Sequence, residues 1–268
     1  MNPSGDLRVD SWRFLPIETK SAAENMAIDE AILNARIAKQ VPNTLRLYRW
    51  NPTTASIGRN QSLNDEVDVE EAENAGVDVV RRISGGGAVL HDRDREITYS
   101  AIVSESDFRA QFGDLSNLQV FHKITEGITR ALYKLAMHPD QGVIHCPAIF
   151  IDGKKVSGNA QARRKGVILQ HGTILLDVDP EFMYSILKVP QGVSKTHMVR
   201  SVYAKVAGIR EYIHNVEVPL LEQCLQEGFA EALDVTFEPG ALTPWEEAEA
   251  ARLVGERYAN PAWTARFA

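Results

Sequence analysis

Apolar residues recur at helical spacing in several parts of the chain. The clearest case is SAAENMAIDEAILNARIA, where Met26, Leu33 and Ile37 fall on one stripe and Ser21 begins a capping-box pattern with Glu24. Weaker patterns of the same kind predict further helices over residues 118–136, 181–188, 216–233 and 244–257. Predicted helices therefore lie towards both ends of the chain, and one more lies within the central stretch, whose pattern is otherwise different.

Short segments rich in β-branched and aromatic residues make up that stretch. TLRLYRW, ASIGR, VDVVRRIS, ITYSAIV and VILQHGTILLDV predict strands, and Asp152-Gly153 between AIFI and KKVSG is a two-residue hairpin signal. The strands cluster with hairpin joins and the helices flank them. We therefore predict an α+β fold with a mixed or antiparallel β-sheet, rather than a regular βαβ winding. No repeat or linker divides the sequence, so residues 1–268 are expected to form one domain.

The overall charge limits the classes of partner. The chain carries 29 lysine and arginine against 36 aspartate and glutamate residues, a net charge of −7, so its bulk charge does not favour nucleic acid or an anionic membrane. There is no secretory leader pattern and no run of about 18 apolar residues, so we expect a cytoplasmic protein. The two cysteines, Cys146 and Cys224, are far apart and suggest neither a disulfide framework nor a zinc site. Local basic clusters are therefore candidate binding sites.

The first such cluster is RRISGGGAVLHD, which begins at Arg81. Backbone N–H groups that glycine leaves uncovered can converge on an anion, and Arg81 or Arg82 would add charge that pairs with a phosphate or carboxylate. The glycines match neither GxxxxGK[ST] nor GxGxxG. The spacing is equally consistent with an anion site and with a tight turn beside solvated arginines.

The second cluster, DGKKVSGNAQARRKG, follows the predicted hairpin and contains five basic residues. It is either a local positive field for an anionic group or a solvated hairpin face, and for Lys165 and at least one arginine we favour the solvated face. Because neighbouring strand residues point to opposite sides of a sheet, only one of Lys154 and Lys155 can face a site on the sheet.

Several ordered motifs together resemble a known family. SGGGAVLHD, GKKVSGNAQARRKGVILQHGTIL and ENMAIDEAIL are similar to the catalytic domain of lipoate-protein ligase A, particularly the archaeal type, in a superfamily with biotin ligases and octanoyltransferases. The resemblance implies the biotin/lipoate protein ligase catalytic-domain fold. It also implies ATP-dependent conversion of lipoate to lipoyl-AMP, with Mg²⁺, and transfer to a lysine of a lipoyl carrier domain. That domain would be of the 2-oxoacid dehydrogenase E2 or glycine cleavage H protein type.

The resemblance also assigns roles to residues. Lys155 would be catalytic and bridge the acyl carboxylate and the α-phosphate, assisted by Arg82. His91 would orient a phosphate or a metal-bound water, or else make a structural hydrogen bond, and His171 would form part of the wall of the lipoate pocket. The remaining residues expected to contact ATP or lipoyl-AMP are Gly85, Gly86, Gly87, Ala88, Val89, Leu90 and Gly158. Asn25 and Asp29, one helical turn apart, would brace the glycine loop.

Two other functions stay open at this stage. One is an octanoyltransferase that uses no ATP and carries the acyl group on Cys146, whose thiolate His145 or the basic hairpin would stabilise. Against it, Gly87 keeps the ligase form of the loop, where octanoyltransferases have arginine. The other is a protein that binds lipoate or a nucleotide without catalysis, which the presence of Lys155 disfavours.

The ligase interpretation carries two further expectations. Ligases often have Asn-Asp shortly before the lysine turn, and this chain has Pro147-Ala148, which weakens the prediction of ATP use. Full-length bacterial ligases have an additional C-terminal domain, so we expect a separate accessory subunit for adenylation. Burial of about 0.8 kcal/mol per methylene gives little selectivity between similar chains, so the sequence does not separate lipoate from octanoate.

Overall fold

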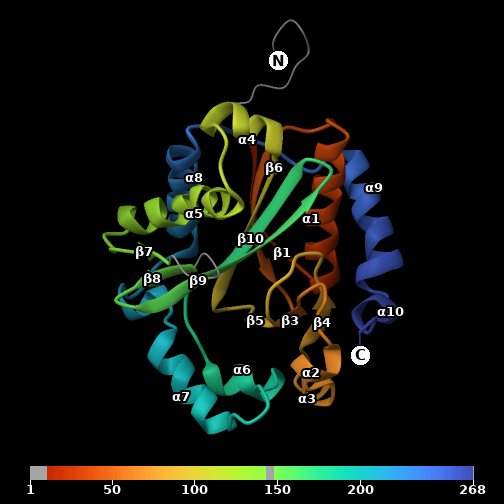
Figure 1. Cartoon of the computed structure of the whole chain (residues 1–268), viewed down its shortest axis with the longest axis vertical. Coiled ribbons are helices and arrows are strands. Elements are labelled where there is room, and N and C mark those ends of the chain that lie inside the picture. Colours follow the sequence, from red (N-terminus) through yellow and green to blue (C-terminus); the bar gives the residue numbers. More distant parts are fainter. Residues whose placement is uncertain (1–10, 143–147, 268) are drawn as a thin grey trace, which may run out of the picture.

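The computed structural model describes residues 11–142 and 148–267, and within them eight strands form one mixed sheet (Figure 1). Their order is β11-β1-β2-β6-β10-β9-β8-β7. The strands are β1 (Ser11–Lys20), β2 (Thr44–Trp50), β6 (Glu96–Ser104), β7 (Asp140–Gln141), β8 (Ala148–Ile151), β9 (Lys154–Arg164), β10 (Val167–Leu175) and β11 (Thr236–Pro239). Strand β1 runs parallel to β2 and β11, and the other pairs are antiparallel. The predicted α+β class with a mixed sheet flanked by helices is confirmed.

Helices α5 (Asn117–Lys134) and α8 (Val218–Leu233) cover one face of this sheet. They approach closely because two glycines face each other: a Cβ built on Gly228 would lie 2.5 Å from the carbonyl oxygen of Gly127. The ring of Phe229 fills the space beside Gly127 and contacts Tyr99 of the sheet at a centroid distance of 5.1 Å. This contact packs α8 against the sheet.

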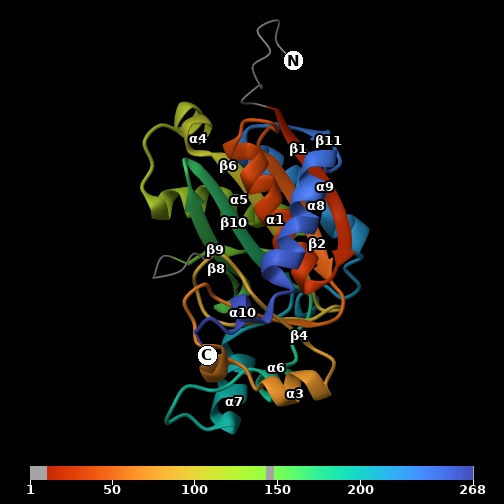
Figure 2. The same ribbon diagram turned by 90° about the vertical axis from the view of Figure 1, so that its right-hand side faces the viewer.

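Helices α1 (Ala22–Ile37) and α9 (Pro244–Leu253) cover the opposite face and lie side by side (Figure 2). The predicted capping box of Ser21 and Glu24 is present at the start of α1. Glu246 of α9 forms a buried ion pair with Arg13 of β1 at 2.6 Å. The chain passes from β1 through α1 to the parallel strand β2, and from β3 through two short helices to the parallel strand β4, so the fold contains βαβ connections beside its antiparallel pairs.

A smaller sheet holds the glycine loop. Its strands are β3 (Thr54–Ile57), flanked by β4 (Asp78–Arg81) and β5 (Val89–His91), and residues 82–88 connect β4 to β5. Helices α2 (Leu63–Glu66), α3 (Val69–Asn74) and α6 (Pro180–Ile186) share a hydrophobic cluster with this sheet. Helix α7 (Lys195–Lys205) packs beside α6, at the end of the molecule opposite α4 (Glu105–Phe112).

The remaining helical segments are short. They are a 3-10 turn at Ile209–Glu211, a π-helical turn at Val254–Tyr258 that continues α9, and α10 (Pro261–Thr264). None of the helices within residues 11–142 and 148–267 has the length and apolar character needed to cross a membrane.

The elements that the sequence predicts are present in the structure, and the structure contains further elements that it did not predict. The strand at 44–50, the hairpin at Asp152-Gly153 and the helix beginning at Ser21 are confirmed. Elements that the sequence did not predict include β1, β11, α2, α3, α4 and α7. Strand β1 contains a proline and is held by parallel pairing with distant segments, and α7 has few apolar residues, so neither has a strong local pattern.

Candidate active site

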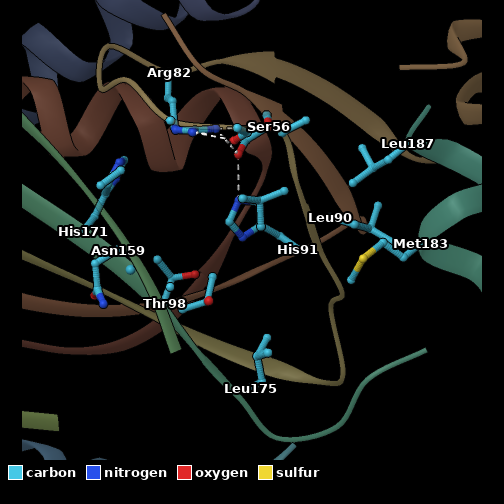
Figure 3. A pocket seen from close by; sticks show the side chains of 18 of the residues that line it. Ser56, Arg82, Leu90, His91, Thr98, Asn159, His171, Leu175, Met183 and Leu187 are labelled. Carbon is cyan, nitrogen blue, oxygen red and sulfur yellow. Dashed lines mark hydrogen bonds between the residues drawn. The ribbon is translucent and has the colours of Figure 1, made fainter. Parts of the chain in front are cut away.

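A cavity of about 320 Å³ lies between the main sheet, the small sheet and helices α6 and α7 (Figure 3). Its apolar wall comes from separate elements and includes Met26, Trp50, Leu90, Leu175, Met183, Leu187, Val202 and Val206. Its polar groups include Ser56, Arg82, His91, Thr98, Lys155, Asn159, His171 and Thr173. A few polar groups set in a largely apolar wall are typical of a site for a small organic group, and the volume lies at the low end of the usual range of about 300–1,000 Å³.

The glycine loop forms one edge of the cavity. Gly86 has φ +95°, a conformation that favours glycine, and its carbonyl packs against Gly58 of the loop after β3. A Cβ at Gly85 or Gly87 would meet no atom within 4 Å. Gly86, Gly87, Ala88, Val89 and Leu90 line the cavity, whereas Gly85 does not. Only the middle glycine of the three is thus required by the geometry of the turn.

Gly58 gives a direct test of this loop contact. A Cβ on Gly58 would lie 2.1 Å from the carbonyl oxygen of Gly86, so Gly58→Ala must displace the loop backbone. We expect the free energy of unfolding to fall by about 1–3 kcal/mol, as for other overpacked sites, and acyl transfer to fall with it. Gly85→Ala is the matched control, because its Cβ has room and its φ is not positive. Equal stability of the two variants in urea denaturation would refute this contact.

The two arginines before the glycines have different surroundings. Arg81 is buried and donates to the carbonyl oxygens of Gly58, Gln61 and Thr264, so it fixes the C-terminal segment rather than an anion. Arg82 lies at the cavity and donates to Ser84 Oγ, to the carbonyl and hydroxyl oxygens of Ser56, and to the carbonyls of Gly85 and Gly87. Arg82 therefore holds the glycine loop in place from within the protein.

His171 connects the glycine loop to α1. Its Nε2 lies 2.6 Å from Ser84 Oγ, and its Nδ1 lies 3.6 Å from Asp29 Oδ2. Burial lowers the pKa of His171 even though Asp29 acts in the opposite direction, which favours the neutral imidazole. Burial alone would raise the pKa of Asp29, but His171 and the charge of Arg46, 2.8 Å away, outweigh it and lower the pKa. Asp29 thus reaches the glycine loop through His171.

Asn25 has a different role from Asp29. Its side-chain amide donates to the carbonyl oxygens of Lys20 and Arg49 and accepts a hydrogen bond from Arg46 at 2.6 Å. These bonds hold the junction of β1 and α1 beside β2. The expectation that Asn25 braces the glycine loop is therefore wrong, because its side chain forms its hydrogen bonds with Lys20, Arg49 and Arg46.

His91 is held by a second buried network. Its Nδ1 lies 2.8 Å from Glu96 Oε1, its Nε2 lies 2.9 Å from Ser56 Oγ, and its ring stacks on Trp50 at a centroid distance of 4.2 Å. Thr98 also donates to Glu96 Oε1. The hydrogen bonds to Glu96 and Ser56 are those expected for a structural role of His91. Its ring also forms part of the cavity wall (Figure 3).

Lys155 projects into the cavity from β9. Its Nζ lies over Gly158, where a built Cβ would be only 2.7 Å away, so the absence of a side chain at Gly158 makes room for the ammonium group. Lys154 points away and forms an ion pair with Glu211 at 3.0 Å. Among the described residues, no carboxylate forms an ion pair with Lys155. Its positive charge is consequently available to a group in the cavity.

The arginines of the second basic cluster are used in structural contacts. Arg163 contacts Glu105 at 3.3 Å, and Arg164 contacts Glu30 of α1 at 2.8 Å. Lys165 is exposed at the turn between β9 and β10. The solvated hairpin face favoured for these residues agrees with their positions, and Lys155 is the lysine of this cluster that lines the cavity.

The two cysteines are in different situations. Cys224 of α8 is buried among core residues, and burial raises the pKa of its thiol, so it is not suited to act as a nucleophile. Cys146, His145 and Pro147 lie outside the described residues. Cys146 precedes Ala148 by two positions in the sequence, and Ala148 pairs with Gly158, the residue beneath the Lys155 ammonium group.

Several residues of the site carried no local signal. Gly58, Ser84 and Asn159 were not singled out from the sequence, although Asn159 lines the cavity and accepts a hydrogen bond from Tyr99 at 2.7 Å. The apolar residues of α6 and α7 were also missed, because nothing in their spacing distinguishes a cavity wall from a core. A glycine after a strand, as in ASIGR, was the one available hint of a close backbone contact.

The described residues do not fit the predicted nucleotide and Mg²⁺. Arg82, expected to assist at a phosphate, donates its hydrogen bonds to the loop and to Ser56. Within the described ranges, no cluster of three or more histidine, cysteine, aspartate or glutamate side chains is arranged to hold a metal ion.

Comparison with known proteins gives a family and a set of relatives. Residues 21–230 match the family model described as the lipoyl protein ligase A/B catalytic domain. The octanoyltransferase LipM of Kyrpidia tusciae is 39% identical over 96% of this chain and 100% of its own, and that of Bacillus subtilis is 32% identical over 96% and 99%. Among solved structures, a bipartite lipoate protein ligase of Thermoplasma acidophilum has a TM-score of 0.83 at 26% identity, covering 96% of this chain and 97% of its own.

A second solved structure, a lipoate-protein ligase A bound with ATP, has a TM-score of 0.82 at 26% identity and covers 96% of this chain and all of its own. The shared fold confirms the resemblance on which the family prediction rested. The predicted ATP-dependent ligase activity is nevertheless wrong, since the relatives that match over nearly the whole chain at 32–39% identity are octanoyltransferases.

The reason for this error lies at Gly87. The sequence analysis used the third glycine of the loop as evidence for a ligase. In the structure a Cβ at Gly87 would meet no atom within 4 Å, so the position accepts a side chain without a change of backbone. A residue that the fold leaves unconstrained is a weak indicator of which reaction the site performs.

Proposed function

The chain belongs to the lipoyl protein ligase A/B catalytic domain family, and we propose that within this family it is an octanoyltransferase. It takes an octanoyl group from a thioester on an acyl carrier protein, holds it on Cys146, and passes it to a lysine of a lipoyl carrier domain. The observation that carries this proposal is the similarity to octanoyltransferases over 96% of the chain.

The acceptor is proposed from the same family. The structurally similar ligase of Thermoplasma acidophilum is described together with its E2 lipoyl domain. A lipoyl domain of the E2 or H protein type presents a single lysine, whose amine is the nucleophile of the second step. The accessory subunit expected for adenylation is not required by a transfer that uses no nucleotide.

The first chemical step is attack by the Cys146 thiolate on the thioester carbonyl. A tetrahedral oxyanion forms and collapses, the carrier thiolate leaves and takes up a proton, and the octanoyl group stays on Cys146 as a new thioester. In the second step the neutral lysine amine of the acceptor attacks this thioester. The amide forms, the amine gives up its proton, and the Cys146 thiolate is released for the next cycle.

Lys155 supplies positive charge for both steps. Its Nζ lies above Gly158, opposite Ala148, which is two residues after Cys146 in the sequence. An ammonium group about 4 Å from a thiolate or oxyanion interacts with it by roughly 4 kcal/mol at an effective dielectric constant of about 20. That interaction favours the reactive thiolate over the thiol and stabilises the charge that develops on the carbonyl oxygen.

The cavity provides the apolar slot for the acyl chain. Met26, Leu175, Met183 and Leu187 line it from three different elements. At about 0.8 kcal/mol per methylene, burial of the octanoyl chain supplies several kcal/mol of binding free energy. This energy is independent of ATP, so it serves a thioester donor as well as it would serve a free acid.

The requirement for a donor tests the proposal. The purified chain is incubated with a lipoyl carrier domain and either octanoyl carrier protein without nucleotide, or lipoate with ATP and Mg²⁺. We expect modification of the acceptor lysine only with the octanoyl carrier protein, and a rate unchanged by added ATP. Modification is measured by mass spectrometry of the acceptor. Modification that occurs only with lipoate and ATP would overturn the proposed function.

A further inference from the structure

A series of hydrogen bonds leads from the cavity to a buried carboxylate. Ser56 of β3 lines the cavity, and its Oγ lies 2.9 Å from His91 Nε2. On the other side of the ring, His91 Nδ1 lies 2.8 Å from Oε1 of Glu96, a residue that is 1% exposed. A hydroxyl, an imidazole and a carboxylate in this order can move a proton, as they do in serine hydrolases. We refer to Ser56, His91 and Glu96 as the Ser56 triad.

The hydrogen bonds around Ser56 give the triad a direction. Arg82 Nη1 donates to Ser56 Oγ at 3.1 Å, so the hydroxyl hydrogen of Ser56 is available to His91 Nε2. A neutral His91 then carries its own hydrogen on Nδ1 and donates it to Glu96. Figure 3 shows Ser56 between Arg82 and His91. A proton that reaches Ser56 Oγ from the cavity can therefore pass to His91, because Ser56 gives up its own hydrogen in the same direction.

Glu96 is suited to stabilise a positive charge on His91. Within residues 11–142 and 148–267, the one ion-pair partner of Glu96 is His91, and Glu96 Oε2 accepts no hydrogen bond. A buried carboxylate is costly unless a cation balances it, so Glu96 favours an imidazolium at His91. Arg82 acts in the opposite direction, since its charge is separated from His91 by one hydroxyl group. The triad is thus able to take up a proton and to release it again.

The second histidine of the cavity is placed differently. His171 contacts Ser84, which does not line the cavity. Its nearest carboxylate, Asp29, is 3.6 Å away and is already paired with Arg46 at 2.8 Å. Burial also lowers the pKa of His171. A proton on His171 would therefore lack both a path from the cavity and a carboxylate of its own, so His91 is the better proton acceptor.

The Ser56 triad lies near the Lys155 ammonium group. A Cβ built on Gly86 would be 3.1 Å from Arg82 Nη2 and 4.0 Å from the Cβ of Ala160. Ala160 is two residues along β9 from Gly158, over which the ammonium group lies, and two residues span about 7 Å of a strand. Arg82, which donates to Ser56, is thus close to the part of β9 where the reaction is proposed to occur.

Amide formation needs a proton acceptor in this cavity. When the acceptor amine attacks the thioester, its nitrogen gains a positive charge, and the tetrahedral intermediate expels the amine again unless a base removes a proton. Among the described residues, no aspartate or glutamate side chain lines the cavity. Arg82 and Lys155 serve as cations there. The base must therefore be reached through a neutral group of the cavity wall, and the Ser56 hydroxyl provides that connection.

We propose that the Ser56 triad accepts the proton that the acceptor lysine releases in the second step; this inference rests on the proposed function. The amine nitrogen bonds to the thioester carbon, and its proton passes to Ser56 Oγ while Ser56 passes its own to His91 Nε2. The bond from that carbon to the Cys146 sulfur then breaks, which leaves the amide and the Cys146 thiolate. His91 returns the proton to water when the product leaves. Glu96 acts through His91 and is a positioning residue.

The test compares two nucleophiles on the isolated octanoyl-enzyme. The lipoyl domain attacks with an amine, which must lose a proton, whereas the carrier protein attacks with a thiolate, which has none to lose. In Glu96→Gln the side-chain oxygen can still accept from Thr98 and His91, so the ring stays in place while the charge is lost. We expect transfer to the amine to fall by about tenfold or more and transfer to the thiolate to stay near the wild-type rate. Ser56→Ala should show the same pattern.

Ser84→Ala is the matched control for damage to the site. It also removes a serine hydroxyl that contacts a histidine and Arg82, but Ser84 lies outside the triad, so any effect should be equal for both nucleophiles. An equal loss with amine and thiolate in folded Glu96→Gln or Ser56→Ala, or an unchanged rate with the amine in either, would overturn the proposal. A wild-type chain that forms no octanoyl-enzyme would instead refute the proposed function, so the two failures are distinguishable.

Discussion

Cys146→Ser is expected to lower kcat/KM for octanoyl transfer by at least about 10³-fold. A serine hydroxyl is far less ionised than a thiol near neutral pH, and removal of a covalent nucleophile leaves only the contributions of binding and orientation. Wild-type enzyme mixed with octanoyl carrier protein in the absence of acceptor should gain one octanoyl group on a peptide containing Cys146. The Ser variant should gain none as a thioester.

The other cysteine provides the matched control. Cys224→Ala removes a thiol that is buried in α8, away from the cavity, and should leave transfer close to the wild-type rate. Alkylation of the enzyme should likewise inactivate it in proportion to modification of Cys146. A Cys146→Ser variant that transfers octanoate at near wild-type rate would exclude the thioester route, whatever the donor.

Lys155→Ala is expected to lower kcat/KM by about 10²–10³-fold, the usual effect of losing one charged or hydrogen-bonding group that stabilises a developing oxyanion. The neighbouring variant Lys154→Ala removes an equal charge from the outer face of the same strand, where Lys154 pairs with Glu211, and should have little effect. Because both variants lose one positive charge, the difference between their rates measures the effect of the position of that charge. Rates are compared under single-turnover conditions, so that formation of the acyl-enzyme is measured directly.

Gly158→Ala tests the same group without removing it. The new Cβ would lie 2.7 Å from Lys155 Nζ, so the ammonium group must move, whereas the backbone of β9 need not. We expect a clear loss of transfer with little change in the free energy of unfolding. A Lys155→Ala enzyme, or a folded Gly158→Ala enzyme, that transfers octanoate at near the wild-type rate would contradict the role given to Lys155.

Part of the site could be predicted because it is encoded locally. The two-residue period of a strand separates Lys154 from Lys155, and Asp152-Gly153 sets the turn from which that period is counted. The glycine loop is visible in the sequence for a similar reason, since consecutive glycines are rare without a need for backbone freedom. These signals depend only on neighbours in the chain.

Other parts depend on residues that are distant in sequence. Ser84 and His171 are 2.6 Å apart although 87 residues separate them, and Gly58 contacts Gly86 across two strands. The choice between Arg81 and Arg82 also has no local basis, because Arg81 donates to the carbonyl of Thr264 and Arg82 to that of Ser56, and both carbonyls are distant in the sequence. Polar networks of this kind cannot be read from spacing.

The sequence by itself determined the fold class, the capped helix at Ser21, the hairpin before Lys155 and the family, because periodicity, turn residues and ordered motifs act over short stretches of chain. Only the tertiary structure decided which basic residues face the cavity and how Asp29 reaches the glycine loop. These features arise from contacts between segments far apart in the chain, and the free energy of such contacts depends on burial and distance, which no local pattern specifies.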